Sequence, residues 1–302
     1  MEESIMEKYL VLDIGGTAIK YAIMTKDADF LEKGSMITPL DGIDIFVETI
    51  GQIYDKYKVG INGIAISMPG VLDVDRGYAY SGGWLTFNSG QNIIELLQAR
   101  CPLPITIEND AKCAALAELG FGSLKGCKDA AVIVLGTGVG GAIIIDGKVH
   151  KGRHSFAGEF SFIKTEASRM NESSSLWGLA NGGPALMRKV AELKGLPLEE
   201  VNGLVTFELA NNGDEEVLAV LDEFTQLIAG QIINIQCVID PELVAIGGGI
   251  SAQPLLVELI QKHLDAMSDN FGFYKPKVKV VPCQYRNDAN LIGALYRFLT
   301  KK

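Results

Sequence analysis

Hydrophobic and polar positions along the chain follow two alternating patterns. Short β-branched and apolar runs predict strands at residues 9–14, 21–24, 61–68, 105–107, 131–135, 142–145 and 243–246. Apolar side chains recur at helical spacing in residues 44–57 and 215–238, and residues 111–119 and 290–299 also predict helices. This succession of strands and helices predicts an α/β fold.

The strand that opens the chain runs into a glycine turn, and the same pattern returns further on. A strand, a glycine turn and a second strand occupy residues 11–24, and a looser copy occupies residues 131–145. The match does not prove a duplication. It predicts two domains, each of which begins with a glycine-turned hairpin.

Composition limits the classes of protein that fit. The chain has 302 residues, enough for two domains or one large one, and 48% of them are hydrophobic, which excludes a disordered chain. A net charge of -10 argues against a nucleic-acid-binding surface, because phosphate contacts require lysine and arginine. The longest apolar run, residues 130–145, is interrupted by glycines and is too short to span a bilayer. We therefore expect neither nucleic-acid binding nor a membrane segment.

Cysteine usage and the amino terminus indicate the compartment. The five cysteines lack CxxC or CxC spacing, which is typical of reduced, mostly buried thiols rather than of a disulfide framework. The acidic start of the chain leads directly into a predicted strand and does not resemble a secretory signal. We expect a cytoplasmic protein.

Four loops carry candidate chemistry, and the first follows the opening strand. Gly15 and Gly16 let backbone N–H groups approach phosphate oxygens, and Thr17 adds a hydroxyl donor. Asp13 suits a Mg²⁺ ion held through water, since this hard cation prefers oxygen ligands and keeps its own waters. The alternative is a tight hairpin that Asp13 merely caps.

Two further loops are rich in glycine. Residues 135–141 lack the Lys-Ser/Thr of a Walker loop, and the strand that follows them excludes a Rossmann fingerprint, so a phosphate loop between two strands remains. Residues 246–251 predict a strand-to-helix turn, on which a base or phosphate can lie against bare backbone. The alternative there is a plain close-packed turn.

The fourth loop, Glu108-Asn109-Asp110, lies at the end of a strand and the start of a helix. An aspartate in the place of Asp110 is often only an N-cap. In a cleft that faces a phosphate loop, the same carboxylate accepts a proton from an attacking hydroxyl, as the base of a kinase does. Both interpretations stay open at this point.

These four loops, in this order, resemble those of the ROK family of sugar kinases and repressors, within the actin/hexokinase-like superfamily. The resemblance covers nearly the whole chain and is carried by DIGGTAIK (13–20), SMPGVLD (67–73), ENDAKCAALAE (108–118), LGTGVGGAII (135–144), AGEF (157–160), IGGGIS (246–251) and DANLIGAL (288–295). It implies two actin/ribonuclease-H-like α/β domains that flank a substrate cleft. Their expected extents are residues 1–121 plus 289–302, with the first phosphate loop, and residues 122–288, with the second phosphate loop and the adenosine site.

The resemblance also implies an ATP-dependent sugar kinase and assigns roles to residues. Asp110 would be the general base that deprotonates a sugar hydroxyl, usually the one at C6, for attack on the γ-phosphate. Asn109, Glu159 and the Gly70 backbone would hold sugar hydroxyls together with Asp110. The residues around ATP and Mg²⁺ would be Asp13, Gly15, Gly16, Thr17, Gly136, Thr137, Gly138 and, beside the adenosine, Gly248. Sugar-driven domain closure would exclude water.

Zinc is the first departure from the family pattern. Phe162 stands where many members have a histidine that binds both the sugar and a zinc ion. The family's cysteine motif is also missing, because no cysteine lies between Cys127 and Cys237. Structural zinc needs about four nitrogen or sulfur ligands, so we expect no zinc site.

The second departure concerns the sugar. Residues 173–183 occupy the place of a glutamate that binds the sugar in many members. An apolar Phe162, with Trp84 and Trp177 in nearby loops, predicts stacking on a second sugar ring or an aglycone, as in the family's β-glucoside kinases. The alternative is that Phe162 and Trp177 belong to the core.

Other functions fit less well or remain as alternatives. ROK repressors carry a helix-turn-helix before the first glycine motif, and only twelve residues precede it here. A non-catalytic sugar sensor is opposed by Asp110 and both phosphate loops. Glucokinase, fructokinase and N-acetylmannosamine kinase remain alternatives among enzymes. The family often pairs its subunits, so the resemblance also suggests a homodimer.

Overall fold

The computed structural model describes residues 7–269, 272 and 278–301. The chain divides into two compact units, Met1–Gly120 with Gly152–Phe156 and Asp288–Lys302, and Phe121–Lys151 with Ala157–Asn287. The domain extents expected from the sequence stay a prediction. The structure adds that Gly152–Phe156 groups with the first unit, although it lies far from that unit's other segments in sequence.

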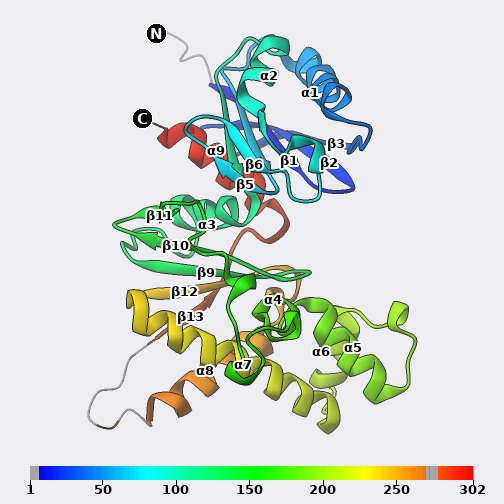
Figure 1. Cartoon of the computed structure of the whole chain (residues 1–302), viewed down its shortest axis with the longest axis vertical. Helices are drawn as coiled ribbons and strands as arrows, with labels where there is room; N and C mark the ends of the chain where they lie inside the picture. The colour runs from blue at the N-terminus through cyan, green and yellow to red at the C-terminus, as the bar shows by residue number, and fades with distance from the viewer. Residues whose placement is uncertain (1–6, 270–271, 273–277, 302) are drawn as a thin grey trace. The chain divides into compact units, whose positions relative to one another are not determined.

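The first unit is built on a sheet with the strand order β3-β2-β1-β4-β8. Figure 1 labels β1, β2 and β3 of this sheet. Its strands are β1 (Lys8–Ile14), β2 (Ala18–Thr25), β3 (Phe30–Ile37), β4 (Ile64–Met68) and β8 (Ile105–Asn109). The strands β1, β2 and β3 pair antiparallel, whereas β1, β4 and β8 run parallel. The three parallel strands are almost wholly buried, which is why they form continuous apolar runs in the sequence.

In the described part of the first unit the α-helices are α1 (Ile43–Tyr57), α2 (Ile93–Arg100), α3 (Asp110–Phe121) and α9 (Ala289–Thr300). Helix α9 packs against β1, β4 and β8, although it comes from the far end of the chain. It also touches α3 very closely, because a Cβ atom on Gly293 would lie 1.7 Å from the carbonyl oxygen of Cys113. A small sheet of β5 (Val71–Asp73), β6 (Tyr78–Ser81) and β7 (Gln91–Asn92) follows β4.

The second unit repeats the same strand order in a sheet β11-β10-β9-β12-β13. Its strands are β9 (Ala130–Leu135), β10 (Val139–Ile145), β11 (Lys148–His150), β12 (Leu243–Gly247) and β13 (Val280–Pro282). Again the first three strands along the chain pair antiparallel, and β9, β12 and β13 run parallel. Both glycine-turned hairpins expected from the sequence are present, as β1–β2 and β9–β10.

The helices of the second unit are α4 (Trp177–Ala180), α5 (Gly183–Lys194), α6 (Gly203–Asn211), α7 (Glu215–Ile239) and α8 (Pro254–Ser268). Helices α7 and α8 pack side by side beneath the sheet (Figure 1), and α7 buries its apolar stripe in the core. The Asp214 side chain caps the start of α7, and Asp240 ends it in a left-handed conformation before Pro241. Among the described residues, none of the helices combines the length and the apolar character that crossing a bilayer requires.

Candidate active site

The candidate residues of the first unit gather at one edge of its sheet. Asp13 is the second-last residue of β1, Gly70 follows β4 by two residues, and Asn109 ends β8 directly before Asp110. Because β1, β4 and β8 are parallel neighbours, their carboxyl ends lie at the same edge. Ligands of open α/β sheets bind at this edge. The fold therefore brings these four residues to a place suited to a substrate.

Asn109 performs the capping role that the sequence left open to Asp110. Its Oδ1 accepts the backbone N–H of Lys112 at 3.2 Å, and its Nδ2 donates to the carbonyl oxygen of Gly70 at 3.1 Å. Asp110 is the first residue of α3 and is half-buried, with its Oδ1 accepting the N–H of Ala111 at 2.8 Å. Since Asn109 already caps the helix, the interpretation of Asp110 as the N-cap is wrong.

Asp13 is a buried carboxylate with a defined set of donors. Ser67 Oγ and Asn290 Nδ2 donate to its Oδ1 at 3.1 and 3.0 Å, and no hydrogen bond reaches Oδ2 from the residues that the structure describes. Burial raises the pKa of Asp13 above its ordinary value, although the bonds from Asn290 and Ser67 oppose that rise. An anionic oxygen at the strand edge suits a hydrated Mg²⁺. Neither Ser67 nor Asn290 was assigned a role from the sequence, although both lie in the motifs SMPGVLD and DANLIGAL.

The raised pKa predicts how stability changes with pH in an Asp13→Asn variant. The pKa of Asp13 is higher in the folded state than in the unfolded state, where it is near 4. Its contribution to stability is therefore complete at pH values below the unfolded pKa and is lost as pH rises through the folded pKa. The amide does not titrate, so the wild type should lose stability relative to Asp13→Asn as pH rises from about 4 to 7. Thermal unfolding across this range measures the difference. The exposed Asp41→Asn variant serves as control, and a parallel pH dependence of wild type and Asp13→Asn would contradict the expectation.

The first glycine loop, residues 15–17, is held by its own hairpin and by Thr38. The N–H of Gly15 donates to the carbonyl oxygen of Ala18 at 3.0 Å, and Thr38 Oγ1 donates to the carbonyl oxygen of Gly15 at 2.7 Å. The N–H of Thr38 donates to the carbonyl oxygen of Thr17 at 3.1 Å. Because the Gly15 N–H closes the hairpin, Gly16 and Thr17, which are both exposed, are the residues that can offer donors to a phosphate.

The second glycine loop, residues 136–138, is braced inside the second unit. The N–H of Gly136 donates to the carbonyl oxygen of Gly138 at 3.0 Å. The N–H of Gly183 donates to the carbonyl oxygen of Gly136 at 2.7 Å. Gly136 and Thr137 are exposed, and β10 begins directly after Gly138. The loop is therefore a short, fixed turn with its backbone open to a ligand.

Gly248 lies against the strand that leads into this loop. Its φ is +95°, and a Cβ atom there would lie 2.1 Å from the carbonyl oxygen of Leu135. Ser251 Oγ donates to the carbonyl oxygen of Gly248 at 2.8 Å. A short 3₁₀ helix, Gly249–Ala252, follows Gly248 and leads to α8, so the strand-to-helix turn predicted here is present. The structure thus brings Gly248 next to the loop of Gly136, Thr137 and Gly138, as a nucleotide site would require.

Glu159 is half-buried and precedes the 3₁₀ helix Phe160–Phe162. Two residues later, Ser161 Oγ accepts the N–H of Val139 and donates to its carbonyl oxygen, both at 3.1 Å. Sequence reasoning missed this tie between the segment of Glu159 and the second glycine loop. Ser161 is a small polar residue without a pattern of its own, so only the folded structure identifies its partner.

The three aromatic residues considered for stacking on a second sugar ring differ in burial. Trp177 is fully buried, packs against Phe160 at a centroid distance of 5.8 Å, and donates its indole N–H to Asn181 Oδ1 at 2.8 Å. The prediction that Trp177 stacks on a sugar is therefore wrong, because its ring and its N–H both have partners in the core. Phe162 and Trp84 are 57% and 85% exposed, so neither is a core residue.

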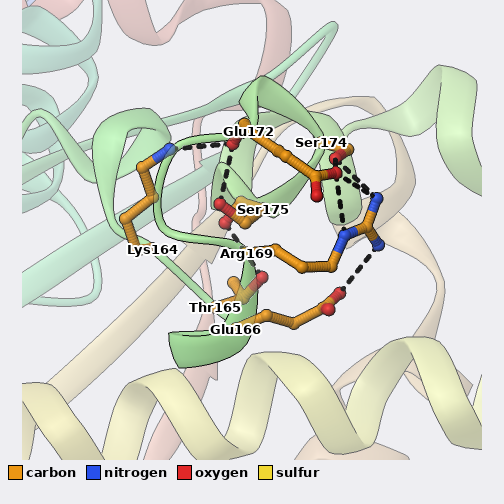
Figure 2. Close-up of polar contacts among 7 residues, drawn as sticks. All are labelled: Lys164, Thr165, Glu166, Arg169, Glu172, Ser174 and Ser175. Carbon is orange, nitrogen blue, oxygen red and sulfur yellow. Dashed lines mark hydrogen bonds and ion pairs between the residues drawn. The ribbon is translucent and has the colours of Figure 1, made fainter.

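The loop in the place of the zinc motif is closed by polar side chains. The Arg169 guanidinium lies 2.8 Å from Glu172 Oε2, 2.8 Å from Ser174 Oγ and 3.5 Å from Glu166 Oε1. Figure 2 shows these side chains gathered around Arg169. On the other side of the loop, Lys164 Nζ and Ser175 Oγ donate to the carbonyl oxygen of Glu172. Hydrogen bonds thus order this loop, and the described residues hold no cluster of three or more side chains suited to a metal ion. The absence of zinc stays a prediction.

Comparisons with known proteins identify the family. The ROK family model matches residues 9–301. The β-glucoside kinase of Listeria monocytogenes is 31% identical over 304 residues, with 98% of each chain covered. The structure of a ROK family protein from Streptococcus pneumoniae in complex with sucrose has a TM-score of 0.87 at 31% identity, covering 97% of this chain and 98% of that one. A ROK glucokinase from Streptomyces griseus, in complex with glucose and AMPPNP, has a TM-score of 0.78 at 25% identity, covering 95% and 98%. With its strand order, its two glycine loops and these relatives, the chain belongs to the ROK family.

Proposed function

We propose that this protein transfers the γ-phosphate of ATP to the C6 hydroxyl of a β-glucoside, with Asp110 as the general base. The reaction class is already established, since membership of the ROK family and full-length likeness to sugar kinases make the chain an ATP-dependent sugar kinase with the two-domain actin-like fold. The proposal concerns the identity of the acceptor, the general base and the individual residues that bind the substrates.

The observation that carries the role of Asp110 is the capping of α3 by Asn109. Asp110 is not the helix cap and lies at the carboxyl edge of the sheet, and both facts support a role in accepting a proton from a bound hydroxyl. As the proton moves to Asp110, the sugar oxygen forms a bond to the γ-phosphorus, and the bond between this phosphorus and the β,γ-bridging oxygen breaks to release ADP. Asn109 and the Gly70 backbone, linked to one another, would hold the same sugar, and Glu159 is a further proposed sugar ligand.

The glycine loops would hold the nucleotide. Gly16 and Thr17 offer exposed donors in the first unit, and the Gly15 N–H closes their hairpin. Gly136, Thr137 and Gly138 offer the second loop, beside Gly248 for the adenosine. Mg²⁺, bound through water to Asp13, would neutralise charge on the phosphates as the transferring group departs. A homodimer and a cytoplasmic location remain further proposals from the family resemblance and the free cysteines.

The residue that replaces a sugar-binding histidine of the family supports the β-glucoside acceptor. The apolar, exposed Phe162 takes the place of a histidine, which removes a polar contact to the sugar and offers an apolar one. Relatives named β-glucoside kinases occur in Listeria monocytogenes, Listeria innocua and Klebsiella pneumoniae at 30–31% identity. Relatives named glucokinase and N-acetyl-D-glucosamine kinase, at 28% identity, represent the alternative of a free monosaccharide.

A panel of acceptors tests this choice. ADP release from ATP–Mg²⁺ is measured with cellobiose, gentiobiose, phenyl β-glucoside, glucose, fructose, N-acetylmannosamine and N-acetylglucosamine. We expect kcat/KM for at least one β-glucoside to exceed that for glucose about tenfold, because one added apolar contact is worth roughly 1–3 kcal/mol. A tenfold or greater preference for any free monosaccharide would contradict the acceptor and leave the kinase assignment intact.

A further inference from the structure

The turn that follows β6, residues 81–85, lies directly against Gly70. A Cβ atom on Gly70 would be 1.9 Å from the carbonyl oxygen of Ser81, and a Cβ atom on Gly83 would be 3.1 Å from Pro69 Cβ and 3.3 Å from the Gly70 nitrogen. Gly70 in turn accepts the Asn109 amide at 3.1 Å. This turn is therefore the immediate neighbour of Gly70, which is itself bonded to Asn109, and all of these residues belong to the first unit.

The turn is firmly held in spite of its two glycines. The N–H of Leu85 donates to the carbonyl oxygen of Gly82 at 3.0 Å, and the N–H of Gly82 donates to Ser89 Oγ at 2.9 Å. Gly83 has a positive φ of 58° and donates its N–H to Ser81 Oγ at 3.2 Å. The side chain of Leu85 is 1% exposed and anchors the turn in the core. The backbone is thus fixed on both sides of residue 84.

Trp84 is left in solvent by this fixed turn. Its side chain is 85% exposed, and within the described part of the chain its indole has neither a hydrogen bond nor a ring contact. A flat ring of this size gains nothing for folding when it stays in water. Because the turn is rigid, Trp84 loses little conformational entropy when a ligand covers its indole. Aromatic residues that bind ligands share this property.

We propose that Trp84 is the stacking wall for the part of the acceptor beyond the phosphorylated ring. The occupant is the second sugar ring or aromatic aglycone of a glucoside, whose flat apolar face lies against the indole. This role rests on the proposed function, because Asn109 and Gly70 fix the phosphorylated ring next to the turn that carries Trp84. It makes Trp84 a residue that determines specificity and takes no part in the transfer of the phosphoryl group.

The kinetic test compares Trp84→Ala with the wild type on two acceptors that share one ring, phenyl β-glucoside and glucose. The ratio of kcat/KM for phenyl β-glucoside to that for glucose should fall at least tenfold, through KM rather than kcat, because the lost contact does not change in the transition state. Trp84→Phe should restore most of the ratio. Val59→Ala, which truncates a 93% exposed side chain elsewhere in the first unit, serves as the matched control. If wild type phosphorylates glucosides and Trp84→Ala keeps the same ratio, the role of Trp84 is disproved and the proposed function stands.

Fluorescence provides a readout that does not need turnover. The protein has two tryptophans, and Trp177 is fully buried, so quenching by iodide reports on Trp84. Phenyl β-glucoside and cellobiose should protect Trp84 from iodide, whereas glucose should protect it much less. Protection without phosphorylation of glucosides would support the Trp84 site and refute the proposed acceptor. Equal quenching with and without glucosides at concentrations that saturate turnover would refute the Trp84 site.

Discussion

Asp110→Asn is expected to lower kcat about 10³-fold while the protein remains folded, since a positioned general base contributes roughly 10²–10⁴-fold. The amide cannot accept the proton of the attacking hydroxyl. It keeps an oxygen that can accept the N–H of Ala111, and Asn109 continues to cap α3. The KM values for ATP and for the sugar should therefore change little, and the thermal unfolding temperature should stay within a few degrees. A coupled assay of ADP release measures kcat and the KM values, and thermal unfolding measures the stability of the variant.

The control for this variant is Asp27→Asn, which removes an exposed carboxylate of the same unit in the β2–β3 turn. It should keep the full kcat. If Asp110→Asn retains more than about a tenth of the wild-type kcat, Asp110 is not the base. A large fall in unfolding temperature would instead mean that the side chain supports the start of α3, in which case the loss of activity says nothing about proton transfer.

The strands and their glycine turns were predictable because their pattern is local. The runs at residues 9–14 and 131–135 are buried on both faces, so every position except Asp13 is apolar, and a glycine turn follows each. The small sheet β5–β6–β7 has short strands in which buried and exposed positions mix, so it gave no comparable signal. The sequence pointed to Trp84 in the turn at residues 81–85, but the contact of this turn with Gly70 depends on the folded structure.

The site shows where local pattern is insufficient. Asparagine and aspartate are equally good caps, so the sequence Asn109-Asp110 does not say which of them caps the helix, and the answer depends on the residue at which α3 begins. The same limit applies to Trp84 and Trp177. Both are tryptophans in segments rich in glycine or serine, yet one is 85% exposed and the other is fully buried, because burial depends on packing partners such as Phe160 and Asn181. Periodicity carries no information on partners that lie far apart in the chain.

The two neighbouring glycines after β12 provide a matched pair for testing the second glycine loop. At Gly248, a Cβ atom would lie 2.1 Å from the carbonyl oxygen of Leu135, roughly an ångström closer than real contacts allow, and φ is +95°. Gly248→Ala must therefore displace Leu135, and with it the adjoining loop of Gly136, Thr137 and Gly138. Because a displacement of 1 Å costs about 10²-fold in catalysis, kcat/KM for ATP should fall by about that factor.

Gly249→Ala is the control, because a Cβ atom at Gly249 meets nothing within 4 Å and this residue does not have a positive φ. The two variants differ by one methyl group at adjacent positions, so the comparison separates the close approach to Leu135 from a general loss of flexibility. Gly249→Ala should keep kcat/KM for ATP within a factor of about two. The sugar KM should respond less than the ATP KM in Gly248→Ala, since Gly70, Asn109 and Asp110 belong to the other unit and only Glu159 among the proposed sugar ligands shares the unit of Gly248. Equal activities of the two alanine variants would show that the approach of Gly248 to Leu135 does not position the loop.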